Sequence, residues 1–268
     1  MRVLNVVVVN YRTPHDLERF LVSLGRNQPK RYGLEVMVKD VDPESPTARK
    51  AVDGIVADAR RVLPSVELGR MSWNCGYGHA VNSGFAALHT VGADDILLAC
   101  NADVEVLEDG SLDACCDALM SNPNWGVLGP RQIDKSGRLT HAGITGTASS
   151  KKIRGWRASG GFRDVNEDMA SVSGSVYFVK GRVWDELSDC YQQPSGSGAF
   201  LETPHYYEET FCSDHAKSHG YKVVYFGEST FIHKWHQSSP IGGSADRKMT
   251  KSRDMYREAC ERLGIDHE

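Results

Sequence analysis

Four groups of residues in this sequence have types and spacing that suit catalysis or ligand binding. The first is a pair of adjacent acids. Glu208 and Glu209 stand just ahead of Phe211–Gly220, a stretch with helical character that ends at a glycine, a residue that commonly closes a helix. One acid of such a pair can satisfy the helix N-terminus while the other points into a cleft. Two acids at a helix start are also common without a catalytic role, so both interpretations stay open.

A second group follows the apolar run Ile96–Cys100, which is predicted to be a buried strand. Asn101 and Asp103 come directly after it, and oxygen donors at a strand end suit Mg²⁺ or Mn²⁺. An Asx turn is the alternative, and the metal interpretation is favoured. Far downstream, His233 ends another predicted strand, with His236 as a rival; a lone histidine at such a place is more often structural than a ligand.

The other two groups suit a nucleotide. Gly76 and Gly78 precede a predicted helix, where backbone and helix N-terminus favour phosphate, although the third glycine of a dinucleotide fingerprint is missing. The polar ends of the first two predicted strands are Asn10-Tyr11 and the pair Asp40 and Asp42. These side chains suit a base edge or a ribose, Tyr11 suits stacking on a ring, and ordinary loop polarity has about equal weight.

Strands and helices alternate through the first half of the chain. Val3–Val9 is β-branched and nearly continuously apolar, as in a strand buried on both faces, and Thr13-Pro14 marks the start of a helix. The alternation continues through the predicted strands Leu34–Val38, Val66–Leu68 and Ile96–Cys100 and the predicted helices Ala48–Val62, Ala80–Leu88 and Leu112–Met120. This pattern predicts a doubly wound, mostly parallel sheet, in which ligands bind beyond the carboxyl ends of the strands.

The second half is irregular. Asp134–Asp168 is predicted to form loops and short strands, and Ser239–Ala245 a loop. The predicted strands are Val172–Val179, Val223–Phe226 and Thr230–Ile232, and Lys248–Leu263 is a predicted helix. Without an internal repeat or a linker, residues 1–268 are expected to form one domain, with two halves (1–120 and 121–238) and a C-terminal loop and helix (239–268).

Composition narrows the class of protein. The chain has 268 residues, 40% hydrophobic and 25% charged, with 31 Lys+Arg against 35 Asp+Glu and a net charge of -4, which excludes collagen-like, disordered and coiled-coil proteins and argues against duplex nucleic acid. The seven irregularly spaced cysteines support neither a disulfide framework nor a zinc ribbon. The apolar N-terminal run is too short for a membrane span and lacks a signal-peptide cleavage site, so we expect a cytoplasmic protein without a transmembrane segment.

Taken in order, segments covering about residues 3 to 238 resemble family 2 glycosyltransferases with the GT-A fold, close to the rhamnosyltransferase-like branch. The segments are VVVVNYRTP, VMVKDVDPES, WNCGYGHAVNSGF, LLACNADVEV, VLGPRQIDKSGRLTHAG, VSGSVYFVKGRVWDEL, YYEETFCSDHAKSHGYKVVYF and STFIHKW. The resemblance implies an α/β fold with a Rossmann-like, mostly parallel central sheet flanked by helices and a short antiparallel portion on the acceptor side. It also implies that residues 1–120 form the nucleotide-sugar-binding half and residues 121–238 the acceptor and catalytic half.

The resemblance also implies roles for single residues. Glu208-Glu209 matches the family's acidic pair, with Glu209 as general base, and Asp103 matches the metal-binding acid, with His233 helping to hold the metal or diphosphate. The nucleotide-sugar contacts would be made by Asn10, Tyr11 and Asp40 at the nucleotide, Asn74, Gly76 and Asn82 at the diphosphate, Asn101 and Ala102 beside Asp103, and Gly174 and Ser175 at the donor sugar.

The implied function is metal-assisted, inverting transfer of a hexose or deoxyhexose from a UDP-, dTDP- or GDP-linked donor to an acceptor hydroxyl, with Mn²⁺ or Mg²⁺ as cofactor. The acceptor, whether glycan, protein, lipid or nucleic acid, stays open; the basic stretch Lys151–Arg157 around Trp156 suits an anionic acceptor or is a solvated loop. The alternatives are a sugar nucleotidyltransferase, which needs a glycine-rich basic loop where this chain has NYRTPHD, and a noncatalytic nucleotide-sugar or glycan-binding module.

Overall fold

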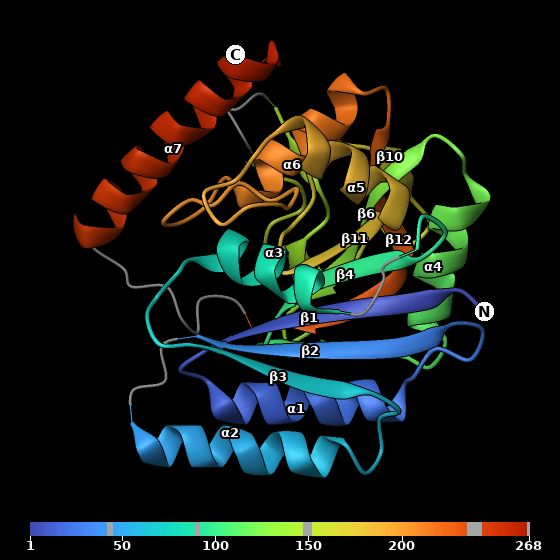
Figure 1. The fold of residues 1–268 in the computed structure, drawn as a ribbon. Helices are drawn as coiled ribbons and strands as arrows, with labels where there is room; N and C mark the ends of the chain where they lie inside the picture. Colours follow the sequence, from blue (N-terminus) through green and yellow to red (C-terminus); the bar gives the residue numbers. More distant parts are fainter. Residues whose placement is uncertain (42–44, 89–91, 147–151, 235–242, 267–268) are drawn as a thin grey trace.

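A ten-stranded sheet runs through the structure, a computed structural model that describes residues 1–41, 45–88, 92–146, 152–234 and 243–266. The strand order is β10-β12-β6-β11-β4-β1-β2-β3, with β5 paired to β12 and β7 to β6 (Figure 1). Four neighbouring strands are parallel: β1 (Val3–Tyr11), β2 (Gly33–Val41), β3 (Val66–Met71) and β4 (Ile96–Asn101).

The register of these parallel strands brings their polar ends together. Asn10 pairs with Asp40 across β1 and β2, and Val9 pairs with Asn101 across β1 and β4. Residues 4–9 of β1 are buried, because the strand has sheet neighbours on both sides and helices over both faces. The residues that the sequence singled out for chemistry therefore follow a rigid, buried support.

The other half of the sheet contains the antiparallel pairings. The strand β11 (Val176–Lys180) runs antiparallel to both β4 and β6 (Trp125–Ile133), while β12 (Lys222–His233) is parallel to β6. Short antiparallel strands complete this side of the sheet: β5 (Val104–Val106), β7 (Leu139–His141) and β10 (Asn166–Asp168). The strands β8 (Ile144–Thr145) and β9 (Lys152–Ile153) form a separate two-stranded antiparallel sheet. The predicted fold class, a mostly parallel sheet with a short antiparallel portion, is confirmed.

Helices cover both faces of the sheet. Alternate residues of β1 point to opposite sides: Val6 and Val8 pack in the core with α1 (Pro14–Arg26), α2 (Pro46–Ala59) and α4 (Ser111–Ser121). On the other side, Val7 and Val9 pack in the core with α3 (Tyr77–Ala87), α5 (Gly181–Cys190) and α6 (Glu208–Ser218). In Figure 1, α1 and α2 lie below the strands β1, β2 and β3, and α3, α5 and α6 lie above them.

The C-terminal helix α7 (Gly243–Leu263) lies outside this second layer (Figure 1). Its buried face contributes Tyr256, Ala259 and Cys260 to a small core with Leu201 and Phe211. The Tyr256 hydroxyl donates a hydrogen bond to Asp214 Oδ2 at 2.6 Å, which ties α7 to α6. No described helix has the length and apolarity needed to cross a bilayer.

The structure differs from the predicted elements in a few places. The two predicted strands at Val223–Phe226 and Thr230–Ile232 form one strand, β12, with a register shift between Phe226 and Thr230. The strand predicted from Val172 begins at Val176, because Ser173–Ser175 forms a turn. The element pattern of the sequence did not predict β6, β5 or α5. The predicted loop Ser239–Ala245 lies mostly outside the described residues, as do Asp42, Lys151 and His236.

Candidate functional site

A cavity of about 400 Å³ opens at the carboxyl ends of β1 and β4. Its lining combines these strand ends with the turn before β11, the start of α6 and the end of β12. Most of the predicted site residues lie in this lining: Tyr11, Asn74, Gly76, Asn101, Ala102, Asp103, Gly174, Ser175, Glu208, Glu209 and His233. Residues nearly two hundred positions apart thus share one cavity.

One side of the cavity holds a carboxylate and an imidazole. Asp103 Oδ1 lies 3.6 Å from His233 Nε2, and both side chains are almost fully buried. Burial is the main cause that raises the pKa of Asp103 to about 6, and the nearby Asp16 adds to the effect, while Lys234 and a hydrogen bond from Asn101 oppose it. Lys234 is itself engaged by an ion pair with Asp16. The negative charge of Asp103 is therefore incompletely compensated by its surroundings.

The chemistry of these donors fits a divalent cation. Carboxylate oxygens suit Mg²⁺ and Mn²⁺, and imidazole is a common ligand of transition metals. A distance of 3.6 Å between Asp103 and His233 is too long for a hydrogen bond but suits two ligands that share one ion. A cation at this place would also supply the charge compensation that the protein does not provide to Asp103.

The acidic pair lies in the lining of the same cavity. The helix α6 begins at Glu208, directly after Tyr206 and Tyr207, whose φ angles of 66° and 73° lie in the left-handed region. Such angles are unusual outside glycine and cluster at functional sites. Glu208 is buried, and burial together with the charge of Glu209 raises its pKa, against hydrogen bonds from Thr203 and the backbone of Tyr206.

Glu209 is the more accessible of the two acids. Its side chain is half-buried and packs against Gly174, where an added Cβ would lie 3.3 Å from three atoms of Glu209. The turn that contains Gly174 is held from two sides: Tyr77 Oη donates to the Gly174 carbonyl at 2.6 Å, and Ser175 Oγ donates to Gln132 Oε1 at 2.7 Å. The Glu209 side chain thus packs against a glycine in a turn that two hydrogen bonds hold in place.

The glycines before α3 serve a close approach of two backbone segments. A Cβ at Gly76 would lie 2.6 Å from the Thr203 carbonyl oxygen, and one at Gly78 would lie 2.3 Å from that of Leu201. Gly76 also has a φ of 82°, and its N–H donates to Asn74 Oδ1 at 3.1 Å. Gly76 and Asn74 line the cavity, whereas the backbone of Leu201 packs against Gly78.

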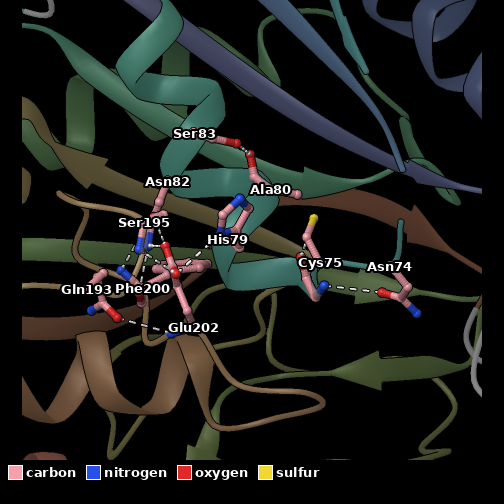
Figure 2. A network of polar contacts seen from close by, with 11 residues as sticks. Asn74, Cys75, His79, Ala80, Asn82, Ser83, Gln193, Ser195, Phe200 and Glu202 are labelled. Atoms are coloured by element: carbon pink, nitrogen blue, oxygen red, sulfur yellow. Dashed lines mark hydrogen bonds and ion pairs between the residues drawn. The ribbon is translucent and has the colours of Figure 1, made fainter. Parts of the chain in front are cut away.

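Asn82 lies outside the cavity lining, in the network of Figure 2. Its Nδ2 donates to the Phe200 carbonyl at 2.9 Å, and its Oδ1 accepts from the Phe200 N–H at 3.2 Å. Glu202 joins the same network through hydrogen bonds with Asn82 and His79. Asn82 therefore holds the segment 200–202 against α3. It does not line the cavity, where the diphosphate was predicted to contact it.

Asn10 and Asp40 also lie behind the lining. Asn10 Nδ2 donates to Asp40 Oδ1 at 2.8 Å, and Asp40 Oδ2 lies 3.4 Å from Arg70 Nε. Both side chains are 1% exposed, so their polar atoms are directed at each other beneath the surface. Of the three residues Asn10, Tyr11 and Asp40, Tyr11 is the one that lines the cavity.

Several lining residues were not predicted. They are Val9, Thr13, Val41, Tyr77, His141, Ile144, Ile153, Ser173, Pro204, His205, Tyr206 and Lys248. Burial, with the nearby His233 and Arg154, lowers the pKa of His141 to about 3, so this ring is neutral beside the cavity. His141 lies in one of the segments that carried the family resemblance, which was a usable signal. Lys248 comes from α7, and nothing in its local sequence indicates that this helix reaches the cavity.

Comparison with known proteins gives a match only at the level of structure. No protein-family model matches this chain, and no curated protein matches it. Solved structures do match: GalNAc-T7 with UDP, GalNAc and Mn²⁺ has a TM-score of 0.67 at 15% identity, over 97% of this chain and 48% of that chain. The mannosyltransferase PcManGT from Pyrobaculum calidifontis, with GDP-Man and Mn²⁺, has a TM-score of 0.64 at 15% identity, over 98% and 65%.

A third match is TarS 1-349 from S. aureus in complex with UDP-GlcNAc, with a TM-score of 0.63 at 17% identity over 100% of this chain and 68% of that chain. This chain thus spans about half to two thirds of the length of these solved structures. The similarity extends over nearly all of its residues, including both halves of the sheet. The chain has the GT-A glycosyltransferase fold.

Proposed function

We propose that this protein is an inverting glycosyltransferase, which moves a sugar from a nucleotide-diphosphate sugar to an acceptor hydroxyl. The observation that carries the proposal is the presence of two residue pairs in the lining of one cavity: Asp103 with His233, and Glu208 with Glu209. A leaving group that develops negative charge and an acceptor that must lose a proton need these two kinds of group. The cytoplasmic location stays a prediction.

The donor would bind along the strand ends. Tyr11 offers a ring for stacking, and the N-terminus of α3 at Tyr77, which lines the cavity, offers a partial positive charge and a backbone N–H to a phosphate. The matched structures of this fold hold UDP, GDP-Man and UDP-GlcNAc, which supports a nucleotide-linked donor. Asn10 and Asp40 would act on it indirectly, by fixing the end of β1 beneath Tyr11.

Asp103 and His233 would hold a divalent ion, Mn²⁺ or Mg²⁺, and phosphate oxygens of the donor would complete its shell. When bound, the ion offsets the charge that develops on the departing diphosphate. Two of the matched structures contain Mn²⁺, which supports this choice of metal. Asn101 would keep Asp103 oriented through its hydrogen bond.

Glu209 would act as general base. Because burial and mutual repulsion raise the pKa of Glu208, a single negative charge is expected on the pair, and it rests on the more accessible Glu209. Glu209 takes the proton of the acceptor hydroxyl while the oxygen attacks the anomeric carbon. The bond between that carbon and the diphosphate oxygen breaks, its electron pair leaves with the diphosphate, and the configuration inverts.

Water can replace the unknown acceptor in a direct test. Proton NMR of each candidate donor with the protein and Mn²⁺ would follow donor loss and the anomer released first, which inversion predicts to be opposite to that of the donor. Glu209→Gln is expected to slow this reaction by about 10²–10⁴-fold while nucleotide affinity is retained. Glu258→Gln, on the exposed side of α7, is the matched control.

Near-wild-type turnover in Glu209→Gln would remove Glu209 from the role of base. Release of the donor's own anomer would contradict inversion. Nucleotide binding without any donor loss, with water or with a panel of acceptors, would contradict the enzyme and indicate a nucleotide-sugar-binding module.

A further inference from the structure

A second group of possible metal ligands lies away from the cavity. Cys190 is the last residue of α5, and His215 and His219 lie near the end of α6. One ligand atom from each lies within 4.8 Å of the others. The two histidines are four residues apart, so they share one face of the helix, and none of the three lines the cavity. The cysteine pattern of the sequence gave no sign of this group, because its members meet only in the folded chain.

His215 has an unusual environment for an imidazole. The residue is 1% exposed, yet neither ring nitrogen has a hydrogen-bond partner within the described parts of the chain. Buried polar side chains are normally hydrogen-bonded, and an exception calls for an explanation such as an ion. Burial also lowers the pKa of His215 to about 4, so the ring is neutral at pH 7, which is the form that binds metal.

His219 is oriented as a metal-binding histidine would be. Its Nδ1 lies 2.7 Å from Glu186 Oε1, and Tyr221 Oη donates to Glu186 Oε2 at 2.7 Å. An ionised carboxylate only accepts hydrogen bonds, so Nδ1 carries the proton and Nε2 keeps its lone pair. Metal-bound histidines almost always donate their other ring N–H to a carboxylate, a backbone carbonyl or water, and such a partner fixes the ring and the tautomer.

We propose that Cys190, His215 and His219 bind Zn²⁺. One thiolate and two imidazoles are typical zinc ligands in tetrahedral geometry. The ligand atoms, within 4.8 Å of one another, need to close in by about 1 Å to reach zinc bond lengths of about 2.0–2.3 Å. Cys190 and His219 reach the surface, so water can take the fourth position. The ion would join the ends of α5 and α6, and it would stabilise the helix whose other end carries Glu208.

Cobalt is the direct probe, because Co²⁺ bound by a thiolate in tetrahedral geometry absorbs strongly and Zn²⁺ does not. The full chain, stripped of metal with a chelator, is titrated with Co²⁺ and then with Zn²⁺. We expect a thiolate-to-cobalt band that saturates at one ion per chain and is displaced by Zn²⁺. The band should be lost in Cys190→Ser and retained in Cys75→Ser and in Asp103→Asn, which removes the candidate ligand of the cavity.

The absence of the band from the wild-type protein, or an undiminished band in Cys190→Ser, would overturn the proposal. Cys190 is exposed, so its substitution leaves the core intact and the test holds even if a His215 variant does not fold.

Glu186→Gln tests the orientation of His219. Competition with a chromophoric chelator should show Zn²⁺ affinity about 10–100-fold weaker than in the wild-type protein. An unchanged affinity in a folded Glu186→Gln variant would exclude this positioning role. Both experiments are independent of the proposed glycosyl transfer.

Discussion

Asp103 is the residue whose surroundings say most about what the cavity binds. A buried carboxylate whose charge is not fully compensated lowers the free energy of unfolding of the metal-free protein. A cation bound beside it raises that free energy again. Its nearest imidazole, His233, comes from the far end of the chain, so the pair exists only when β5 and β12 are paired. Folding and cation binding at this position are therefore coupled.

The first prediction concerns the pH dependence of stability without metal. Asp103 has a pKa of about 6 in the folded protein against an ordinary value of 3.8, so the folded state holds its proton more tightly than the unfolded state. Its contribution is full below about pH 4 and is lost as the pH rises through 6, which costs on the order of 3 kcal/mol at pH 8. In EDTA, Asp103→Asn should therefore unfold at a higher temperature than the wild-type protein at pH 8.

The same comparison at pH 3 should show almost no difference, because Asp103 is then protonated in the folded state and largely neutral in the unfolded state. Asp254→Asn, at an exposed carboxylate on α7, is the control for a general loss of negative charge. A wild-type protein more stable than Asp103→Asn at pH 8 without metal would contradict the account of this site.

The approach of α3 to the segment 200–203 depends on glycine. In Gly78→Ala the new methyl group would lie 2.3 Å from the Leu201 carbonyl oxygen, so α3 or the segment must move. Such overpacking is expected to lower the free energy of unfolding by about 1–3 kcal/mol. Urea denaturation followed by circular dichroism measures the change.

Gly54→Ala is the matched control, because Gly54 lies in α2 with nothing within 4 Å of an added Cβ. This variant should be more stable than the wild-type protein by up to about 1 kcal/mol, because alanine favours a helix. Equal effects of the two substitutions would show that the close contact at Gly78 is not maintained in solution.

Strands with strong local patterns were predictable, and those with weak patterns were not. The first strand is mostly β-branched and nearly continuously apolar, and its prediction is confirmed. The strand β6 contains Gly126, Gly129 and Pro130, which lower strand propensity, and these residues answer to tertiary contacts: a Cβ at Gly129 would lie 2.4 Å from Val172. The local sequence pattern of β6 does not reveal this contact, because Val172 is distant from Gly129 along the chain.

The candidate site shows the same division. Polar residues at strand ends, such as Asp103 and Asn101, were found because the carboxyl ends of parallel strands meet at one edge. Asn82 and Asp40 are equally polar residues, but their side chains form hydrogen bonds within the protein and do not reach the cavity surface. Lys248 was missed because only the packing of α7 brings it to the cavity.

The cavity joins two parts of the chain. The parallel strands β1 and β4 supply Tyr11 and Asp103, while β12 and α6 supply His233 and the acidic pair. The antiparallel strand β11 lies between them in the sheet and follows the turn of Gly174 and Ser175. The two parts of the chain are thus held by one continuous sheet, and Asp103 and Glu209 already share one cavity in this structure.

Thermal unfolding of the full chain with UDP, dTDP, GDP and their sugars, with and without Mn²⁺, tests the central claim most directly. A nucleotide at a hundredfold excess over its dissociation constant adds about 2.7 kcal/mol, equivalent to about 5–10 °C for a chain of this size. We predict such a shift for one base, present only with Mn²⁺ and absent in Asp103→Asn. No shift with any nucleotide, or an equal shift in Asp103→Asn, would contradict the account.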